Sequence, residues 1–531
     1  MNHAILYFLL GGFALAAEQL WPAGTRRVLH DVGLAASRMA QRKWLVAAGL
    51  VALVLGLRAA LLPLWPIPHP VIYDEFSYLL QADIFAHGRL AMPMHPMWRF
   101  FETIYVLQKP AMASRYPPGQ ALAMAVGQIL LGHPWFGVWL SAGVLAAVFW
   151  WAFRAWLPRG WPLVASALAL PLCIYSYWMN SFWGGAVTAI GGALVTGALG
   201  RIQSGKSRSS PWLLGCGAVI LIYCRPWEGL LLLVPALLWP ALRNRCWKIW
   251  LPVFTVGAVG LAGLALDNYA VTGNPLRLPY FEYSAQYAST SPFSFVPPRP
   301  RPNYGHVNLE LIDQGWERTT WEKARTWQFL RQRPGEWYLQ LTVLLGSGLL
   351  LALLIPGLLV RRVRPLAIFA LFMLGGSLLQ GPWFSHYAAP FTASLFILVV
   401  SGLRVLHTRS PALAFALPAA VLLAAAATGT RDIARHRTPD QIQPIVSQRD
   451  AVAARLLNSH PGRHVVFVKY TVVKIPHDEW IYNLADIDAE PLIWAQDMGE
   501  AENRKLMDYY PGRQFWLFQP DDDIMKMTSL P

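Results

Sequence analysis

Twelve apolar runs of roughly membrane-spanning length dominate this sequence. A helix that crosses the hydrocarbon core of a bilayer needs about 20 apolar residues, with roughly 17 to 25 allowed. Two of the runs are short, and we expect them to form a hairpin that turns at 224–228. The predicted spans are 4–20, 44–65, 134–153, 162–180, 184–200, 212–223, 227–241, 249–267, 337–359, 365–380, 385–403 and 411–428.

The composition agrees with a bilayer as the main solvent. Hydrophobic residues make up 55% of the chain and charged residues 14%, which excludes an ordinary soluble, disordered or fibrous protein. Run 4–20 has an alternative interpretation as a signal peptide. No basic region precedes it and no small-residue cleavage site follows it cleanly, so we expect a retained helix.

The formal charge of +15 is concentrated between the apolar runs. Loops 21–43, 154–161, 201–211, 241–248, 360–364 and 404–410 contain 18 Lys and Arg residues and one acid, Asp31. By the positive-inside rule these loops are cytoplasmic, and alternation puts the N-terminus, loops 66–118 and 268–335 and the tail from 429 outside. The basic composition is therefore an orientation signal and does not indicate a nucleic-acid partner.

We divide the chain into three parts. Residues 1–43 form an N-terminal helix and a basic cytoplasmic loop, 44–428 form the membrane domain, and 429–531 change character. In the last part, expected strands at 465–469, 491–495 and 514–518 alternate with helical patterns at 447–459 and 501–510. This alternation predicts a small α/β domain outside the membrane.

Acidic and basic residues meet in the outer loop 66–118. Asp74 and Glu75 follow a span by a few residues, at a depth where carboxylates are costly. The run 114–120 carries two prolines that forbid helix just before the next apolar stretch, and so provides a rigid re-entry point. Acid and base are thus expected at one membrane interface.

Five motifs resemble the GT-C superfamily of membrane glycosyltransferases, in particular its protein mannosyltransferase and aminoarabinose transferase branch. They are YDEFSY at 73–78, YPPG at 116–119, Arg225-Pro226, NPLRLPY at 274–280 and HYAAP at 386–390. The resemblance implies a mostly α polytopic protein of about 12 transmembrane helices. It also implies a polyprenyl-phosphate sugar as donor and Asp74 as the catalytic base or acceptor-orienting acid. Glu75 and Glu102 compete for the role of a second acid.

The expected chemistry assigns roles to the charged residues. Inverting transfer needs one carboxylate to take the acceptor's proton, and cations that stabilise the leaving phosphate. Asp74 and Glu75 are the predicted catalytic pair, and we expect the donor phosphate at Lys109, Arg115, Arg225 and His386. The predicted substrate-binding residues are Tyr73, Tyr78, Glu102, Tyr116, Glu228, Tyr280 and Tyr387.

Each assignment has a structural alternative. Asp74 and Glu75 are also suited to capping an interfacial helix. Arg225 and Glu228 have the spacing of an i, i+3 ion pair. Lys109 and Arg115 are also suited to anchoring the chain at lipid headgroups, and His386 to a structural role at the membrane interface.

We predict neither metal nor nucleotide. The four cysteines form no CxxC pair, and Asp74 with Glu75 supplies too few ligands to hold magnesium firmly, although some superfamily members use a divalent cation. Segment 205–207 lacks the upstream glycine of a phosphate-binding loop. The Asp486-Ile487-Asp488 sequence imitates a metal-binding DxD motif, but we interpret it as a solvated turn.

The predicted function is transfer of a sugar from a polyprenyl-phosphate donor to a protein, lipid or glycan acceptor, at the outer face of a bacterial-type cytoplasmic membrane. Two alternatives remain. One is a transporter or flippase of lipid-linked sugars, with Arg225, Glu228 and Asp267 along its path. The other is a non-catalytic envelope scaffold whose tail domain does the binding.

Overall fold

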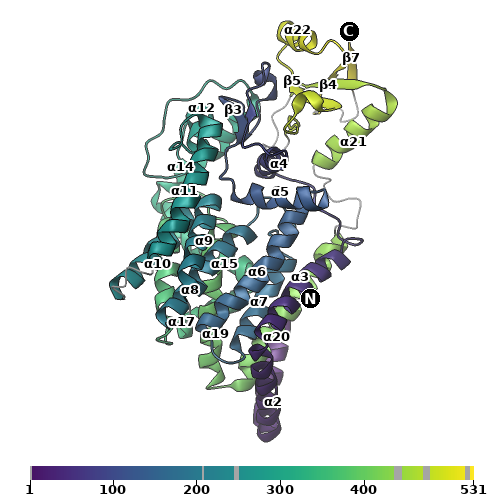
Figure 1. Ribbon diagram of the computed structural model, residues 1–531. Helices are drawn as coiled ribbons and strands as arrows, with labels where there is room; N and C mark the ends of the chain where they lie inside the picture. Colours follow the sequence, from purple (N-terminus) through teal and green to yellow (C-terminus); the bar gives the residue numbers. More distant parts are fainter. Residues whose placement is uncertain (1–2, 206–207, 244–249, 436–444, 471–478, 521–526) are drawn as a thin grey trace.

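The computed structural model describes residues 3–205, 208–243, 250–435, 445–470, 479–520 and 527–531. The protein is mostly helical (68%). A long helical bundle forms one end of the molecule and a small sheet forms the other, with α4 (Tyr73–Ala86) and α5 (Gly119–Leu131) between them (Figure 1).

The segment 21–43, which we predicted to be a basic cytoplasmic loop, contains the helix α2 (Pro22–Gln41). The other long bundle helices overlap the predicted apolar runs in position. They are α1 (His3–Leu20), α3 (Lys43–Ala60), α6 (Trp135–Trp156), α7 (Trp161–Ile174), α8 (Ala186–Gln203), α9 (Ser210–Cys224), α10 (Pro226–Arg243), α11 (Trp250–Thr272), α15 (Trp327–Leu345), α18 (Pro365–Ser377), α19 (Thr392–His407) and α20 (Pro411–Arg435). Short helices complete this half of the chain: α12 (Pro279–Tyr287), α13 (Val307–Glu310), α14 (Arg318–Ala324), α16 (Gly348–Ala352), α17 (Leu354–Gly357), the π-helix η3 (Leu311–Glu317) and the 3-10 helix η4 (Ser385–Phe391).

Fewer helices than predicted have the full length of a membrane span. Among the described residues, five are long and apolar enough to cross a bilayer: α3, α6, α11, η4 with α19, and α20. The number rises to seven if each of two sharply bent pairs, α1 with α2 and α15 with α16 and α17, counts as one span. The remaining predicted runs lie on α8 or on the shorter helices α7, α9, α10 and α18.

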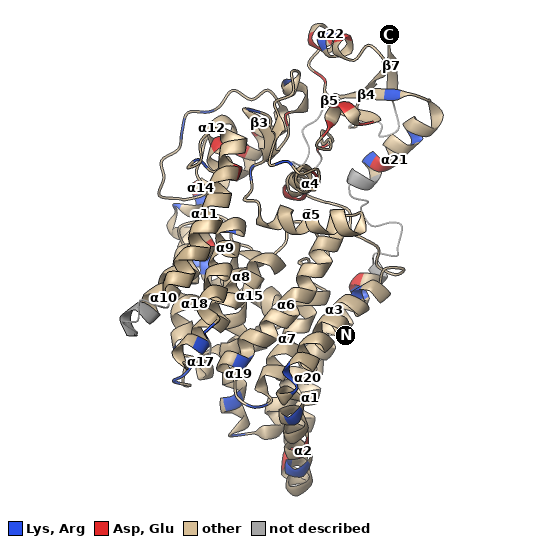
Figure 2. Ribbon diagram, in the orientation of Figure 1, with Lys and Arg blue, Asp and Glu red and all other residues tan. Residues whose placement is uncertain are grey.

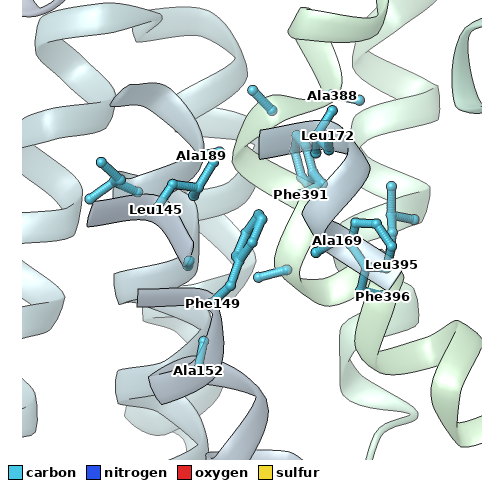
Figure 3. Close-up of a cluster of buried hydrophobic side chains, with 14 of the residues drawn as sticks. Leu145, Phe149, Ala152, Ala169, Leu172, Ala189, Ala388, Phe391, Leu395 and Phe396 are labelled. Atoms are coloured by element: carbon cyan, nitrogen blue, oxygen red, sulfur yellow. The ribbon is translucent and has the colours of Figure 1, made fainter. Parts of the chain in front are cut away.

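The bundle core is packed from large aromatic and small aliphatic side chains. Phe149 of α6 is 1% exposed and lies among residues of α7 and α19 (Figure 3). Gly192 of α8 allows a close approach to η4, because a Cβ atom there would lie 1.9 Å from the carbonyl oxygen of Pro390. This contact presses the segment that carries His386 and Tyr387 against the bundle.

The outer loop 66–118 folds into α4, a 3-10 turn and a small antiparallel sheet. The turn is η1 (Trp98–Phe101), and the strand order is β1 (Met92–Pro93), β3 (Ala111–Ser114), β2 (Val106–Leu107). The two prolines end the extended segment, and α5 begins at Gly119. A Cβ atom at Gly119 would lie 2.5 Å from Sγ of Cys224, so α5 starts directly on the end of α9. The re-entry segment and the α9–α10 break are therefore neighbours.

The C-terminal part contains the three strands predicted from the sequence. They are β4 (Arg463–Val468), β5 (Leu492–Gln496) and β6 (Arg513–Phe518), joined by β7 (Met527–Leu530) in the order β5-β4-β6-β7. Strand β4 pairs in parallel with β5 and β6, and β7 pairs antiparallel to β6. The accompanying helices are α21 (Ile445–Ser459), η5 (Ile487–Ala489) and α22 (Glu500–Tyr509).

This sheet is docked onto α4. The ring of Tyr482 stacks on that of Phe76, with centroids 4.0 Å apart and planes 6° apart. The backbone N–H of Ala485 donates to Oδ2 of Asp83 at 3.0 Å. The C-terminal unit therefore supports the helix that begins with the predicted catalytic acids.

The two ends of the molecule differ in charge. Figure 2 shows mainly Lys and Arg near the lower ends of the bundle around α2, α17 and α19, whereas residues of both signs lie around α21, α22 and the C-terminal sheet, and acids lie at α4 and α12. The excess of basic residues between the apolar runs of the sequence thus lies at one end of the molecule.

Candidate active site

Asp74 lies in the first turn of α4 and is half-buried. The hydroxyl of Tyr116 donates a hydrogen bond to its Oδ1. Burial raises the pKa of Asp74 above its ordinary value, while the Tyr116 hydrogen bond and the charges of Arg115 and Arg225 oppose that rise. The Asp74 carboxylate therefore lies near Arg115 and Arg225 but forms no direct ion pair with either.

Glu75 is buried and faces the backbone. Its Oε2 accepts hydrogen bonds from the N–H groups of Val71 at 2.7 Å and Ile72 at 3.3 Å. Its Oε1 accepts from the N–H of Phe182 at 2.8 Å. Burial raises the pKa of Glu75 to about 7 against these three donors. The carboxylate caps α4 and fastens it to the loop between α7 and α8.

Arg115 is buried among tyrosines and held by one carboxylate. Its Nη1 lies 3.3 Å from Oε1 of Glu317, and its guanidinium lies 3.1 Å from the ring centroid of Tyr105. The ring centroids of Tyr280 and Tyr283 lie 5.0 and 5.1 Å from the same guanidinium. Its Nε is shielded from solvent and has no hydrogen-bond partner among the described residues.

Tyr105 is strained into its position beneath Arg115. It has φ of +63°, which a non-glycine residue adopts only when its surroundings require it. Its N–H donates to the hydroxyl of Tyr283 at 3.1 Å, and its carbonyl accepts from the hydroxyl of Ser77 at 2.6 Å. Its own hydroxyl donates to Glu317 at 3.0 Å. These contacts aim the ring and the carboxylate at the same guanidinium.

Arg225 stands at the break between α9 and α10. Pro226 disfavours helical geometry at the residue before it, and Arg225 is non-helical, with φ of −147° and ψ of 82°. Its Nη1 lies 3.8 Å from Oε1 of Glu228, and its guanidinium lies 4.4 Å from the ring centroid of Tyr387. The ion pair that the sequence offered as an alternative is present, and it coexists with a position near Asp74.

Two further predicted tyrosines line the same region. Tyr78 stacks on Tyr116 with centroids 4.6 Å apart. Tyr73 meets the ring of Tyr105 edge to face at 4.8 Å. Both are buried and complete the aromatic surroundings of Arg115 and Asp74.

Lys109 and Glu102 lie in another part of the outer loop. The exposed Lys109 ammonium packs over the ring of Trp98 at 4.7 Å. Glu102 accepts a hydrogen bond from the hydroxyl of Tyr287 at 2.7 Å, and burial raises its pKa. The structure does not place either residue in contact with Asp74 or the two arginines.

His386 contacts Tyr387, whose ring also lies near the Arg225 guanidinium. Its ring centroid is 4.8 Å from that of Tyr387, and its Nδ1 lies 2.8 Å from the hydroxyl oxygen of Tyr177. The histidine is thus next to the arginine site through a shared tyrosine.

Sequence reasoning missed Tyr105 and Glu317. Neither stands in one of the recognised motifs, and Glu317 ends the π-helix η3 in the loop 268–335. Single-turn π segments in larger helices often mark functional positions, but their presence is not evident from residue types. Tyr105 carries a conformational signal that only the structure reveals.

The described residues contain no group of three or more His, Cys, Asp or Glu side chains that could hold a metal ion. What the site offers is one half-buried carboxylate beside two arginines, each oriented by its own glutamate and an aromatic ring. Fixed guanidinium groups are suited to binding a phosphate, and a carboxylate of raised pKa is suited to accepting a proton.

The chain as a whole is similar to several solved structures. The chain is similar to ArnT from Cupriavidus metallidurans bound to undecaprenyl phosphate, with 14% identity, coverage of 89% of this chain and 93% of that chain, and a TM-score of 0.48. It is also similar to the oligosaccharyltransferase AglB from Archaeoglobus fulgidus in complex with an inhibitory peptide and a dolichol-phosphate, with 12% identity, coverage of 90% and 69%, and a TM-score of 0.45. These neighbours are GT-C glycosyltransferases, the class that the motifs resemble. No family model and no curated protein matches the chain.

Proposed function

We propose that this protein is an integral membrane glycosyltransferase that uses a polyprenyl-phosphate sugar as donor. The observation that carries the proposal is the placement of Asp74 beside Arg115 and Arg225, each held by a separate carboxylate, Glu317 and Glu228. This arrangement provides a proton acceptor and a phosphate site within one aromatic enclosure.

The proposed reaction uses these groups in distinct roles. Asp74 takes the proton from the acceptor as the acceptor oxygen or nitrogen bonds to the anomeric carbon. The bond between that carbon and the phosphate oxygen breaks, and its electron pair leaves with the polyprenyl phosphate. Arg115 and Arg225 stabilise the negative charge that develops on this phosphate. Attack opposite to the leaving group inverts the anomeric centre.

Other carboxylates have supporting roles in this proposal. Glu75 holds the start of α4 through three backbone N–H groups, and Glu228 and Glu317 orient the arginines. Tyr116 donates to Asp74 and keeps the ionised form available near the acceptor. Glu102 and Lys109 belong to the outer loop and are proposed to contact the acceptor.

We further propose that the site faces the outside of a bacterial-type cytoplasmic membrane, in a chain of about twelve crossing segments. The excess of Lys and Arg at the end of the bundle opposite the C-terminal sheet supports this orientation. Residues 429–531 then form an extracytoplasmic α/β domain, on the same side as the N-terminus.

The test is a donor panel with purified protein. Polyprenyl-phosphate hexoses and pentoses are incubated with protein, lipid or glycan acceptors, and released polyprenyl phosphate is measured. Asp74→Asn preserves the shape that receives the Tyr116 hydrogen bond but removes the base, and we expect a loss of at least about 100-fold in kcat, within the range of general-base contributions. Asp31→Asn, at an exposed position on α2, is the matched control. Near-normal turnover by Asp74→Asn contradicts the proposal.

A further inference from the structure

Five aromatic side chains lie close together beside Arg225. We call them the ring cluster; Tyr177, Trp183, Phe384 and Tyr387 are half-buried, and His386 at their centre is 2% exposed. The imidazole centroid lies 4.6 Å from that of Trp183 and 5.8 Å from that of Phe384, whose plane is within 6° of its own. Because four of the five rings are partly exposed, a ligand can contact them.

An unusual backbone conformation positions Trp183 in the ring cluster. Trp183 lies in the non-helical segment between α7 and α8, directly before Gly184 and Gly185, which have φ of +75° and +144°. A Cβ atom at Gly184 would lie 2.4 Å from Oε1 of Gln120, and one at Gly185 would lie 2.3 Å from the ring of Trp178. Irregular backbone between apolar helices is tolerated where it is buried or lines a cavity. Two glycines are therefore required to present this tryptophan.

The centre of the ring cluster is polar and oriented. Nδ1 of His386 lies 2.8 Å from the hydroxyl oxygen of Tyr177, which lies 2.9 Å from Oγ of Ser385. The N–H of Ser385 donates to Oε1 of Gln340 at 2.9 Å. No described residue forms a hydrogen bond with Nε2 of His386. Nε2 therefore has an unused hydrogen-bonding position that a bound polar group can fill.

The ring cluster adjoins the phosphate site. Tyr387 belongs to both, since its ring lies 4.4 Å from the Arg225 guanidinium and 4.8 Å from the His386 ring. A group covalently attached to a phosphate at Arg225 therefore reaches the ring cluster within about one ring width.

We propose that the ring cluster is the sugar subsite, in which the donor sugar packs on Trp183 and one of its hydroxyls bonds to Nε2 of His386. The inference rests on the proposed function. The C–H groups on one face of a sugar pack on an aromatic ring, and a hydroxyl both donates and accepts, so it pairs with Nε2 in either neutral tautomer. His386 and Trp183 bind the sugar and take no part in proton transfer.

An isoprenoid occupant fits the ring cluster less well than a sugar. The structure has an apolar groove of about 440 Å³ between α9 and α11, lined by residues such as Trp212, Val219 and Val259. That groove is typical of a surface for hydrocarbon. The ring cluster differs because a histidine nitrogen and two hydroxyls lie at its centre.

The test compares two lipids that differ only in the sugar. Binding of undecaprenyl phosphate and of undecaprenyl-phosphate hexoses and pentoses is measured by calorimetry with the full chain in detergent. We expect the wild type to bind at least one sugar-bearing lipid more tightly than undecaprenyl phosphate. Trp183→Ala and His386→Leu should each weaken that lipid about tenfold and leave undecaprenyl phosphate within twofold. Trp183→Phe should recover most of the loss, and Trp44→Ala, at an exposed position at the start of α3, is the matched control.

Each other outcome has a defined meaning. Equal weakening of both lipids shows that the ring cluster holds isoprenoid and overturns the subsite, as does unchanged binding in both variants. A wild type that binds the two lipids equally also overturns it, while the phosphate site stands. A wild type that binds neither lipid overturns the proposed function itself. If Trp183→Ala does not fold, the comparison of Trp183→Phe and His386→Leu decides.

Discussion

Glu317 is paired with Arg115, 202 residues away in the sequence, through a contact of 3.3 Å between Oε1 and Nη1. The same oxygen accepts the hydrogen bond of Tyr105, whose ring lies against the guanidinium. The π-helix of one outer loop thus fixes the cation of the other. Through this pair, loop 66–118 and loop 268–335, which are far apart in the sequence, form one site.

Removing the Glu317 charge should destabilise the protein. Glu317→Gln keeps the shape and a hydrogen-bond acceptor but leaves Arg115 buried without its counter-charge. Loss of one partner of a buried pair costs about 3–5 kcal/mol, and we expect about 1–3 kcal/mol because the amide retains some contacts. Thermal unfolding in detergent measures it. The control Glu322→Gln breaks only the exposed pair with Arg318 and should change the free energy of unfolding by about 0.5 kcal/mol or less.

Replacing either arginine by lysine should weaken donor binding. Arg115→Lys and Arg225→Lys keep the charge but lose the planar fork and the stacking on Tyr105 or Tyr387. We expect KM for the donor to rise about tenfold in each variant, equal to about 1.4 kcal/mol. Steady-state kinetics with varied donor provides the measurement. Lys109→Gln should leave this KM within twofold, and a larger effect there would return Lys109 to the phosphate site.

Tyr116→Phe should shift the pH dependence of the reaction. Asp74 accepts a proton only when ionised, so kcat/KM falls as pH is lowered, with a midpoint above the ordinary value of about 3.9 because burial raises the pKa of Asp74. The Tyr116 hydrogen bond favours the ionised form and lowers that pKa. Its removal therefore moves the midpoint upward, by about one pH unit for a hydrogen bond worth about 1.5 kcal/mol. A midpoint that stays in place or moves downward contradicts the role of Tyr116.

Glu75→Gln should separate structure from chemistry. The Glu75 carboxylate accepts hydrogen bonds from three backbone N–H groups. In the glutamine variant, the NH₂ group of the amide must face at least one of these donors and cannot accept its hydrogen bond. The unsatisfied donor costs about 1–3 kcal/mol of stability, whereas kcat of the folded enzyme should fall far less than in Asp74→Asn. Tm and kcat are measured on the same preparation. An unchanged Tm with a kcat as low as that of Asp74→Asn would make Glu75 a catalytic group.

The stack of Phe76 on Tyr482 should couple the C-terminal sheet to α4. The single variants Phe76→Leu and Tyr482→Leu and the double variant form a cycle, read from the free energy of unfolding. Aromatic pairs contribute about 0.5–1.5 kcal/mol beyond burial, and we expect a coupling energy in this range. A cycle on Phe149 and Tyr482, which lie in separate core clusters, should give no coupling.

Adjacent positions on a helix show why the site could be predicted only in part. Asp74 and Glu75 look alike in sequence, next to each other after a span. In an α-helix they point about 100° apart, so one faces the arginines and the other faces the backbone of the α7–α8 loop. The direction of each depends on how α4 is rotated, and the docking of Tyr482 and Ala485 contributes to that rotation.

The sequence by itself indicated a lipid bilayer as the surroundings of the bundle and located most of the main helices and strands. Apolar runs mark the bundle helices because water excludes such segments, short apolar segments between helical patterns mark strands β4, β5 and β6, and Pro226 marks the break at Arg225. Among the described residues, five helices, or seven if each bent pair is one span, have the full length expected of the twelve predicted spans, because several apolar runs form shorter helices. Only the tertiary structure decided which charges meet. The pairing of Glu317 with Arg115, the strained backbone of Tyr105 and the place of Lys109 on Trp98 depend on contacts between distant segments, and local residue patterns do not encode those distances.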